Sequence, residues 1–221
     1  MLQVRSFTFS PIQENTYLVY NEAGDTCIID PGCYNGREQN ELSSYIEHQK
    51  LVPRLLLNTH CHLDHVFGLN WAAQKYSLTP HIHFSEKQML ELAPMNGDMW
   101  GLPFEGYKGP LNYLKEGEII RVGDDEMKIL FAPGHSPGHV CFYYEAHNAA
   151  TETRQADFVI AGDVLFKQSI GRTDLPGGNF KVLIESIREQ LFVLPGDTIV
   201  YPGHGEPTTI GYEKKYNPFL Q

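Results

Sequence analysis

The chain has 221 residues, of which 42% are hydrophobic and 20% are charged, the proportions of an ordinary soluble globular protein. This length suits a single domain with one well-buried core. The formal net charge is −10, from 17 basic and 27 acidic side chains. That balance argues against a general nucleic-acid surface, because such a surface needs a basic stripe.

The N-terminal segment 1–7 alternates like a strand and has no apolar leader. No apolar run approaches the roughly 18 residues that a membrane helix needs. The four cysteines lack C-x-x-C spacing and are predicted to be free, buried thiols; they are Cys27, Cys33, Cys61 and Cys141. We therefore expect a cytoplasmic protein without structural disulfides.

The first half of the chain alternates between short apolar runs and helical segments. Three runs predict the strands of an antiparallel meander, at residues 4–9, 16–20 and 26–29. Asp30-Pro31-Gly32 stops the third strand, and a helix at 38–49 leads to a buried strand around 55–57. A short strand at 81–83 follows, with Ser85 as the N-cap of the next helix.

The second half repeats this theme. Residues 94–112 are rich in Gly, Pro and aromatic side chains, fit no regular element and are predicted to form a loop over the functional site. Four apolar runs then predict strands, at residues 119–121, 127–131, 140–144 and 158–162. A helix at 179–192 and a strand at 198–201 follow. Periodicity alone supports a mixed α/β domain.

The run H-x-H-x-D-H at residues 60–65 is the most informative stretch of the chain. It places three imidazoles and a carboxylate on the loop between a buried strand and a helix. His60 and His62 alternate as on a strand end, so both side chains are expected to point one way and Cys61 to point the other. Neutral imidazole and carboxylate are the usual protein ligands of zinc and similar divalent ions, so the run predicts a metal site.

Three more candidate ligands stand alone, each at the C-terminal end of an apolar run. They are His135, Asp163 and His204. Strands are rigid supports, and the loops at their ends leave a site open to solvent. The other histidines have simpler interpretations: His81 and His83 fit a structural strand end, and His48 and His147 fit the surface.

With these residues in place, the sequence resembles the metallo-β-lactamase superfamily over nearly its whole length. The family pattern is H-x-H-x-D-H, a lone His, a bridging Asp and a last His, and every part is present. Segments 169–176 and 209–220 resemble the short glyoxalase II-like thioesterases. The resemblance implies an α/β fold, a four-layer αβ/βα sandwich of two mixed sheets with outer helices. It also implies that residues 1–221 form one hydrolase domain without an added C-terminal helical domain.

The resemblance also implies a role for each ligand. One metal ion would be held by three imidazoles, those of His60, His62 and His135. A second ion would be held by a carboxylate and two imidazoles, those of Asp64, His65 and His204. Asp163 would bridge the two. We expect two divalent ions, with zinc first and iron or manganese as alternatives, because His and Asp ligands do not distinguish among them.

Three further side chains are predicted to support the ligands. Asp30 matches a superfamily aspartate that supports the metal-binding loop, and Thr59 beside the first ligand is a weaker case. His139 follows His135 by four residues and is a candidate to hydrogen-bond the site, as metal ligands commonly require.

Arg172 is the predicted substrate-binding residue. It lies nine residues after Asp163 and matches in charge a basic residue that contacts the glutathione moiety in glyoxalase II proteins. Asp174 stands where those enzymes carry a Tyr, and this difference leaves the mode of substrate binding open.

These features predict a metal-dependent hydrolase of glutathione-type thioesters such as S-lactoylglutathione. A hydroxide bridging the two ions would attack the carbonyl carbon, with Asp64 helping to orient it. The thiolate leaves with a conjugate-acid pKa of about 8.5, so it needs no dedicated general acid. The expected partner is a small anionic thioester, with no nucleic acid or membrane partner, and we expect a monomer or small homo-oligomer.

Other functions share the pattern. Persulfide dioxygenases have a similar Gly-Arg-Thr-Asp loop but use one iron with two imidazoles and a carboxylate, here His60, His135 and Asp163. Lactone or phosphodiester hydrolysis on the same scaffold is another alternative. A catalytically silent binding protein is disfavoured, because no ligand of the pattern is missing.

Overall fold

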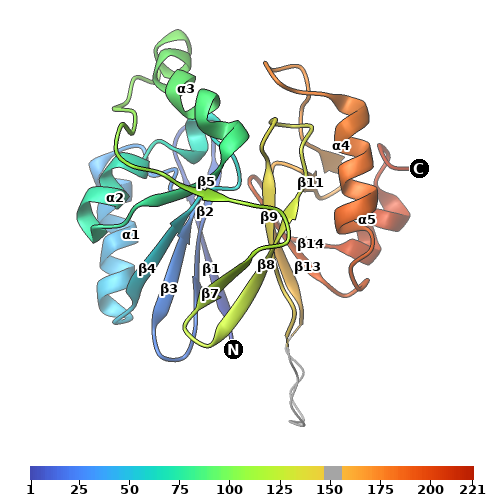
Figure 1. Cartoon of the computed structure of the whole chain (residues 1–221), viewed down its shortest axis with the longest axis horizontal. Helices are drawn as coiled ribbons and strands as arrows, with labels where there is room; N and C mark the ends of the chain where they lie inside the picture. Colours follow the sequence, from blue (N-terminus) through green and yellow to red (C-terminus); the bar gives the residue numbers. More distant parts are fainter. Residues whose placement is uncertain (147–155) are drawn as a thin grey trace.

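The computed structural model describes residues 1–146 and 156–221, so His147, predicted at the surface, lies outside the described residues. Two six-stranded sheets face one another, and helices cover the outer side of each (Figure 1). The predicted four-layer α/β sandwich is therefore confirmed. Such layering arises because each sheet buries one face against its partner sheet and the other against helices.

The first sheet has the order β1-β2-β3-β4-β5-β6. Its strands are β1 (Gln3–Phe9), β2 (Glu14–Tyr20), β3 (Asp25–Ile29), β4 (Val52–Leu57), β5 (Pro80–His83) and β6 (Asn112–Leu114). The first three pair antiparallel, which confirms the predicted meander, whereas β3 to β6 pair parallel. Ile29 and Leu57 are partners in the register, so β3 and β4 end side by side.

Three helices lie on the outer side of this sheet (Figure 1). They are α1 (Gly36–His48), α2 (Leu69–Tyr76) and α3 (Lys87–Met99). Helix α1 begins where the Asn35 side chain accepts hydrogen bonds from the N–H groups of Arg37 and Glu38, which have no partner inside the helix. A 3-10 turn, Leu63–His65, comes between β4 and α2.

Two predictions around α3 are wrong. Ser85 is not a helix N-cap: it lies in a 3-10 turn, Phe84–Glu86, and its N–H donates to the His83 side chain. Residues 94–99 are not loop but the end of α3, despite Pro94 inside the helix. Buried residues recur along α3 at helical spacing, including Met89, Ala93 and Gly97, and this packing outweighs the unfavourable composition.

The second sheet has the order β14-β13-β10-β9-β8-β7. Its strands are β7 (Ile119–Val122), β8 (Asp125–Phe131), β9 (Val140–Tyr144), β10 (Phe158–Gly162), β13 (Ile199–Pro202) and β14 (Thr208–Thr209). The sheet is mixed: β10 and β13 pair parallel and the other pairs are antiparallel. The small hairpin β11 (Leu165–Phe166) and β12 (Ser169–Ile170) stands apart.

Helices α4 (Phe180–Ser186) and α5 (Ile210–Tyr216) lie against the second sheet (Figure 1). The predicted helix at 179–192 is confirmed in outline: Asn179 caps α4, and a π-helical turn, Ile187–Leu191, continues it. Helix α5, about two turns long, was not predicted from the sequence.

The buried core has one part for each space between layers. Between the two sheets pack large side chains from both, among them Tyr17, Leu57, Phe142 and Ile160. A second cluster lies under α1, α2 and α3 and includes Leu42, Leu56, Leu69 and Leu90. A third lies under α4 and includes Val159, Leu183, Ile187 and Val200. All four cysteines are free and buried, as predicted.

The loops that leave these strands gather at one edge of the sandwich. Because β10 and β13 run parallel, Asp163 and His204 leave the second sheet at the same edge. Backbone hydrogen bonds tie this edge together: Gly203 N–H donates to Gly162 O (2.8 Å) and Asn15 N–H donates to Gly203 O (2.7 Å). Among the described residues, no helix is long and apolar enough to cross a membrane.

Candidate metal centre

Three imidazoles converge at the centre of this edge. Nδ1 of His62 lies 2.8 Å from Nε2 of His135, which in turn lies 3.2 Å from Nε2 of His60. The three side chains form a group of potential metal ligands. Two of them come from the loop after β4 and one from the loop after β8, so both sheets contribute to the group.

His60 and His135 each make a hydrogen bond through Nδ1, the ring nitrogen that faces away from the group. These bonds determine which nitrogen of each ring carries the proton. His135 donates from Nδ1 to the backbone carbonyl of Arg172 (2.8 Å). The Thr59 hydroxyl gives its proton to Asp30 Oδ2 (2.6 Å), so its oxygen accepts from His60 Nδ1 (3.1 Å). Since a neutral imidazole carries one N–H, Nε2 of each ring is left with a lone pair facing the other.

Burial keeps this group in the neutral form. It lowers the pKa of His60 well below the usual value, and neighbouring imidazoles lower it further. Burial, together with His135, lowers the pKa of His62 to about 3. Burial also lowers the pKa of His135. Neutral imidazoles that converge in this way can each turn a ring-nitrogen lone pair toward a cation, as a metal site requires.

A second, more acidic group adjoins the first. Asp64, His65 and His204 lie within ligand distance of one another. His204 Nε2 is 3.1 Å from Asp64 Oδ2, and its Nδ1 donates to the Gln13 carbonyl (3.1 Å). Burial alone would lower the pKa of His204, but the contact with Asp64 and the charge of Asp163 raise it, and a cation between the ring and the carboxylate would take the place of the proton.

Asp163 lies between the two groups. Its carboxylate is 3.5 Å from Nε2 of His135 in one group, 3.4 Å from Nε2 of His65 and 3.6 Å from Nε2 of His204 in the other. Asp163 Oδ1 and His65 Nε2 are both buried, make no well-formed hydrogen bond and lie 3.4 Å from each other. Buried polar atoms normally have partners, and a cation between these two atoms would provide one for both.

The carboxylates control ionisation in the acidic group. Burial alone would lower the pKa of His65, but Asp163, Asp64 and Asp30 outweigh it and raise the pKa well above the usual value. The pKa of Asp163 is lowered despite its burial, because three imidazoles face it. Without a metal ion the group thus holds protons, and a divalent cation would take their place.

Asp30 accepts hydrogen bonds from Thr59 and His65 on the side of these residues that faces away from the candidate ligand atoms. Its Oδ1 accepts from Thr59 N–H (2.7 Å), and its Oδ2 accepts from the Thr59 hydroxyl and from His65 Nδ1 (3.1 Å). Asp30 has a positive φ of 51°, which Asp tolerates better than most residues. Asp30 and Thr59, predicted as supports, thus orient His60 and His65.

His139, the third predicted support, is fully buried. Its Nε2 accepts a hydrogen bond from the backbone N–H of Asp163 (3.0 Å). Its ring stacks on that of His60, with centroids 4.8 Å apart. His139 therefore contacts His60 of the first group and Asp163, which lies between the two groups.

Glu86 was missed in the sequence and holds the two histidine loops together. Its carboxylate accepts from Cys61 N–H (2.8 Å), Ser136 Oγ (2.5 Å) and Gly138 N–H (2.6 Å). These residues flank the histidines of the first group. Burial raises the pKa of Glu86 although its hydrogen bonds oppose the shift. Glu14, also missed, is buried behind His65, 3.9 Å from its Nδ1.

Arg172 contributes to the site in two ways. Its backbone carbonyl fixes His135, as described above. Its exposed guanidinium forms two hydrogen bonds with Asp174, at 2.7 and 2.8 Å, and this pairing lowers the pKa of Asp174 to about 2. The residue that replaces the family Tyr therefore holds the predicted substrate-binding side chain.

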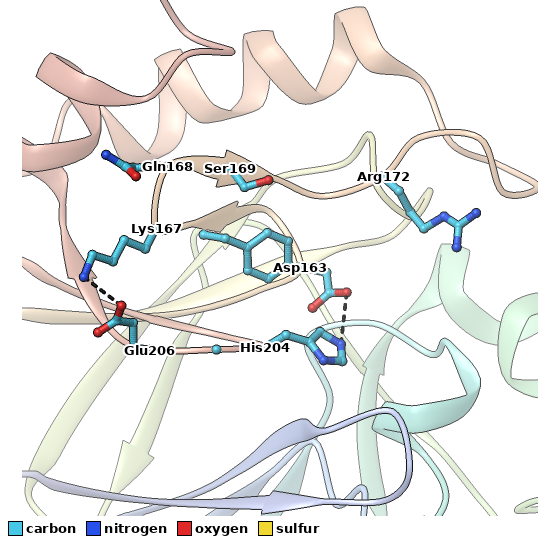
Figure 2. A pocket seen from close by; sticks show the side chains of 9 residues that line it. Asp163, Lys167, Gln168, Ser169, Arg172, His204 and Glu206 are labelled. Atoms are coloured by element: carbon cyan, nitrogen blue, oxygen red, sulfur yellow. Dashed lines mark hydrogen bonds and ion pairs between the residues drawn. The ribbon is translucent and has the colours of Figure 1, made fainter.

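Two cavities meet at the candidate ligands. One, of about 750 Å³, is lined by Asp163, Phe166, Lys167, Gln168, Ser169, Arg172, His204, Gly205 and Glu206. Figure 2 shows Lys167, paired with Glu206, and Arg172 at opposite ends of this cavity. The other, of about 350 Å³, shares Asp163, Arg172 and His204 and is bounded by apolar side chains from α3.

Known sequences resemble this chain over its whole length. The family model of the Metallo-beta-lactamase superfamily matches residues 10–204. Probable metallo-hydrolase YqgX of Bacillus subtilis is 38% identical over 98% of this chain and 96% of that protein. Hydroxyacylglutathione hydrolase GloC of Haemophilus influenzae is 35% identical over 99% of this chain and 98% of that protein.

Solved structures give the same result. BLEG-1 B3 metallo-beta-lactamase superposes with a TM-score of 0.87 at 33% identity, over 99% of this chain and all of that one. TTHA1623, in a di-iron-bound form, superposes with a TM-score of 0.84 at 37% identity, over 98% of this chain and all of that one.

Proposed function

Because the chain belongs to the metallo-beta-lactamase superfamily, we propose that it is a metal-dependent hydrolase of glutathione-type thioesters. In this proposal the first ion is held by His60, His62 and His135. The second is held by Asp64, His65 and His204, with Asp163 between them. Zinc is the expected metal, and the di-iron form of one similar structure makes iron the main alternative.

One observation carries the proposal: two neutral imidazoles, His60 and His135, face each other through unprotonated Nε2 atoms at 3.2 Å. A structural pair of histidines would share a proton along this contact; the nearest other ring nitrogen is His62 Nδ1, 2.8 Å from His135 Nε2. The adjoining carboxylates of Asp64 and Asp163 add the negative charge that a second divalent ion needs. Bound metal ions would supply activated water and stabilise negative charge on the carbonyl oxygen.

The chain's own groups do the remaining work. Asp30, Thr59 and Glu86 hold the imidazoles in position, so little reorganisation is needed when substrate binds. Arg172 lines the larger cavity together with Asp163 and His204, and its planar fork, here paired with Asp174, suits a carboxylate of the thiol carrier. A thiolate needs no proton in order to leave, which agrees with a site that has no spare general acid.

The thioester assignment is supported by Arg172 and by the likeness to hydroxyacylglutathione hydrolase GloC. We propose a small anionic thioester as the substrate, a cytoplasmic setting, and no nucleic acid or membrane partner. The net charge of −10 agrees with the exclusion of nucleic acid, and two bound cations would reverse the local field for an anionic substrate.

The test is turnover on a single metal-analysed sample. Thiol release from S-lactoylglutathione is the expected result, with glutathione persulfide in an oxygen electrode and a β-lactam as comparison substrates. Persulfide-dependent oxygen uptake without thiol release would indicate a mononuclear-iron dioxygenase instead. Preferential lactam, lactone or phosphodiester hydrolysis would reassign the substrate but keep the hydrolase.

A further inference from the structure

The smaller cavity has an apolar wall that the proposed chemistry does not use. The wall faces the candidate ligands and comes from three separate segments of the chain. Its members are Ile12 from the β1–β2 turn, Met89, Met99 and Trp100 from α3 and its end, and Leu175 and Pro176 from the loop after β12. Asn96 adds an amide to this wall.

Two of these side chains are unusually exposed for their type. Met99 has 75% and Trp100 53% of its surface accessible. Large exposed apolar groups that cluster at the mouth of a cavity mark a binding site more often than they occur by chance. Here both line a cavity that is also lined by His62, Asp64 and Asp163.

The backbone holds this part of the wall in place. Trp100 N–H donates to the carbonyl of Asn96 (3.0 Å), and Leu102 N–H donates to that of Gly97 (2.8 Å). Gly101 between them has a φ of 71°, which ends the helix and turns the chain. The part of the apolar wall formed by Met99 and Trp100 is therefore anchored to α3.

The size of the cavity indicates what it accommodates. A water molecule takes up about 30 Å³ in the liquid, so 350 Å³ is far more than the methyl and hydroxyl groups of a lactoyl chain would fill. A lactoyl group would leave the apolar wall wet. A phenyl or branched alkyl group in the same place would displace that water and gain the free energy of apolar burial.

We propose that the acyl group of the physiological thioester is bulky and apolar, and that Trp100 and Met99 select it. This inference rests on the proposed function and adds the substrate class to it. The acyl group would occupy the 350 Å³ cavity with its carbonyl at the candidate ligands. The thiol carrier would occupy the larger cavity between Lys167 and Arg172.

Two matched substrates test this: S-lactoylglutathione, and S-mandeloylglutathione, in which phenyl replaces methyl and the α-hydroxyl is kept. We expect kcat/KM for the mandeloyl thioester to be about tenfold higher or more, since a single methylene in an apolar pocket is already worth about tenfold. Trp100→Ala should reduce that preference about tenfold, and Met99→Ala less.

Met95→Ala is the control variant. Met95 lies on the same helix and is 52% exposed, but it is not part of the cavity wall. It should leave the ratio of the two kcat/KM values unchanged, and circular dichroism checks that all three variants fold. Equal efficiency on both thioesters, or an unchanged ratio in Trp100→Ala, would overturn the inference alone. Hydrolysis of neither thioester by the metal-loaded protein would overturn the proposed function as well.

Discussion

Nε2 of His60 lies 3.2 Å from Nε2 of His135, and the hydrogen bonds on the far side of each ring leave both atoms without a proton. Two lone pairs at this distance repel each other. The arrangement persists because Thr59, Asp30 and the Arg172 carbonyl hold the rings from behind. Hydrogen bonds from these surrounding residues therefore offset the repulsion and hold the imidazoles in a position ready for a metal ion.

The first prediction concerns the number of metal ions. The purified protein should bind two equivalents, because two ligand groups flank Asp163. Asp163→Ala should retain the first ion, lose the second and lose most activity, since the three imidazoles remain but the bridging carboxylate does not. Elemental analysis after dialysis gives the count. Asp98→Ala, which removes an exposed carboxylate elsewhere, should keep both ions, and a fully active parent with one ion would contradict the prediction.

The second prediction concerns Asp30. Asp30→Asn keeps the size of the side chain, and Asn tolerates the positive φ of 51°. It cannot accept all the hydrogen bonds that Asp30 takes from Thr59 and His65. Metal affinity should fall by about 10–100-fold, the usual effect of removing a ligand's support. Competition with a chromophoric chelator measures this, and unchanged affinity would show that the ligands need no support from Asp30.

Much of the site could be predicted from the sequence, because each candidate ligand follows an apolar run and belongs to a specific residue type. Glu86 could not, since its local sequence resembles that of any helix start. Its burial depends on Ser136, 50 residues away in the chain. The direction of the Arg172 side chain could not be predicted either, because its pairing with Asp174 depends on the conformation of the turn between them.

The parts of the fold that could not be predicted from the sequence also depend on contacts between residues far apart in the chain, or are too short to give a pattern. Most strands were predicted because an apolar run bounded by turn residues is a local signal, and the four layers came from the family resemblance. Residues 94–99 were misread because Pro94 and Gly97 suggest a loop, whereas packing of Ala93 and Gly97 against neighbouring elements stabilises a helix. Short elements such as β14 carry too few residues for a periodic signal.

The third prediction concerns Glu86. Glu86→Ala leaves two backbone N–H groups and the Ser136 hydroxyl without their acceptor in a buried position. Each unpaired group costs about 1–3 kcal/mol, and removing a buried carboxylate offsets part of that. We expect the free energy of unfolding to fall by about 3–5 kcal/mol. Glu91→Ala on the exposed face of α3 is the control and should stay within about 0.5 kcal/mol; urea denaturation compares them.

The fourth prediction concerns Arg172. Arg172→Ala removes the guanidinium but keeps the backbone carbonyl that fixes His135, so KM should rise with a smaller change in kcat. Asp174→Ala should lower KM, because it frees the guanidinium from its present partner. Steady-state kinetics on S-lactoylglutathione separates the two parameters. An Arg172→Ala variant with the KM of the parent would make that side chain a bystander.

The last prediction separates the hydrolase from the dioxygenase. A dioxygenase with a single iron needs only His60, His135 and Asp163 as its ligands. Here Asp64 and His204, 3.1 Å apart, add ligands that our proposal assigns to a second ion. We therefore expect thiol release from S-lactoylglutathione and no oxygen uptake with glutathione persulfide. Removal of metal by a chelator should abolish the hydrolysis, and zinc should restore it. Restoration by ferrous iron alone, together with persulfide-dependent oxygen consumption, would assign the protein to the dioxygenases.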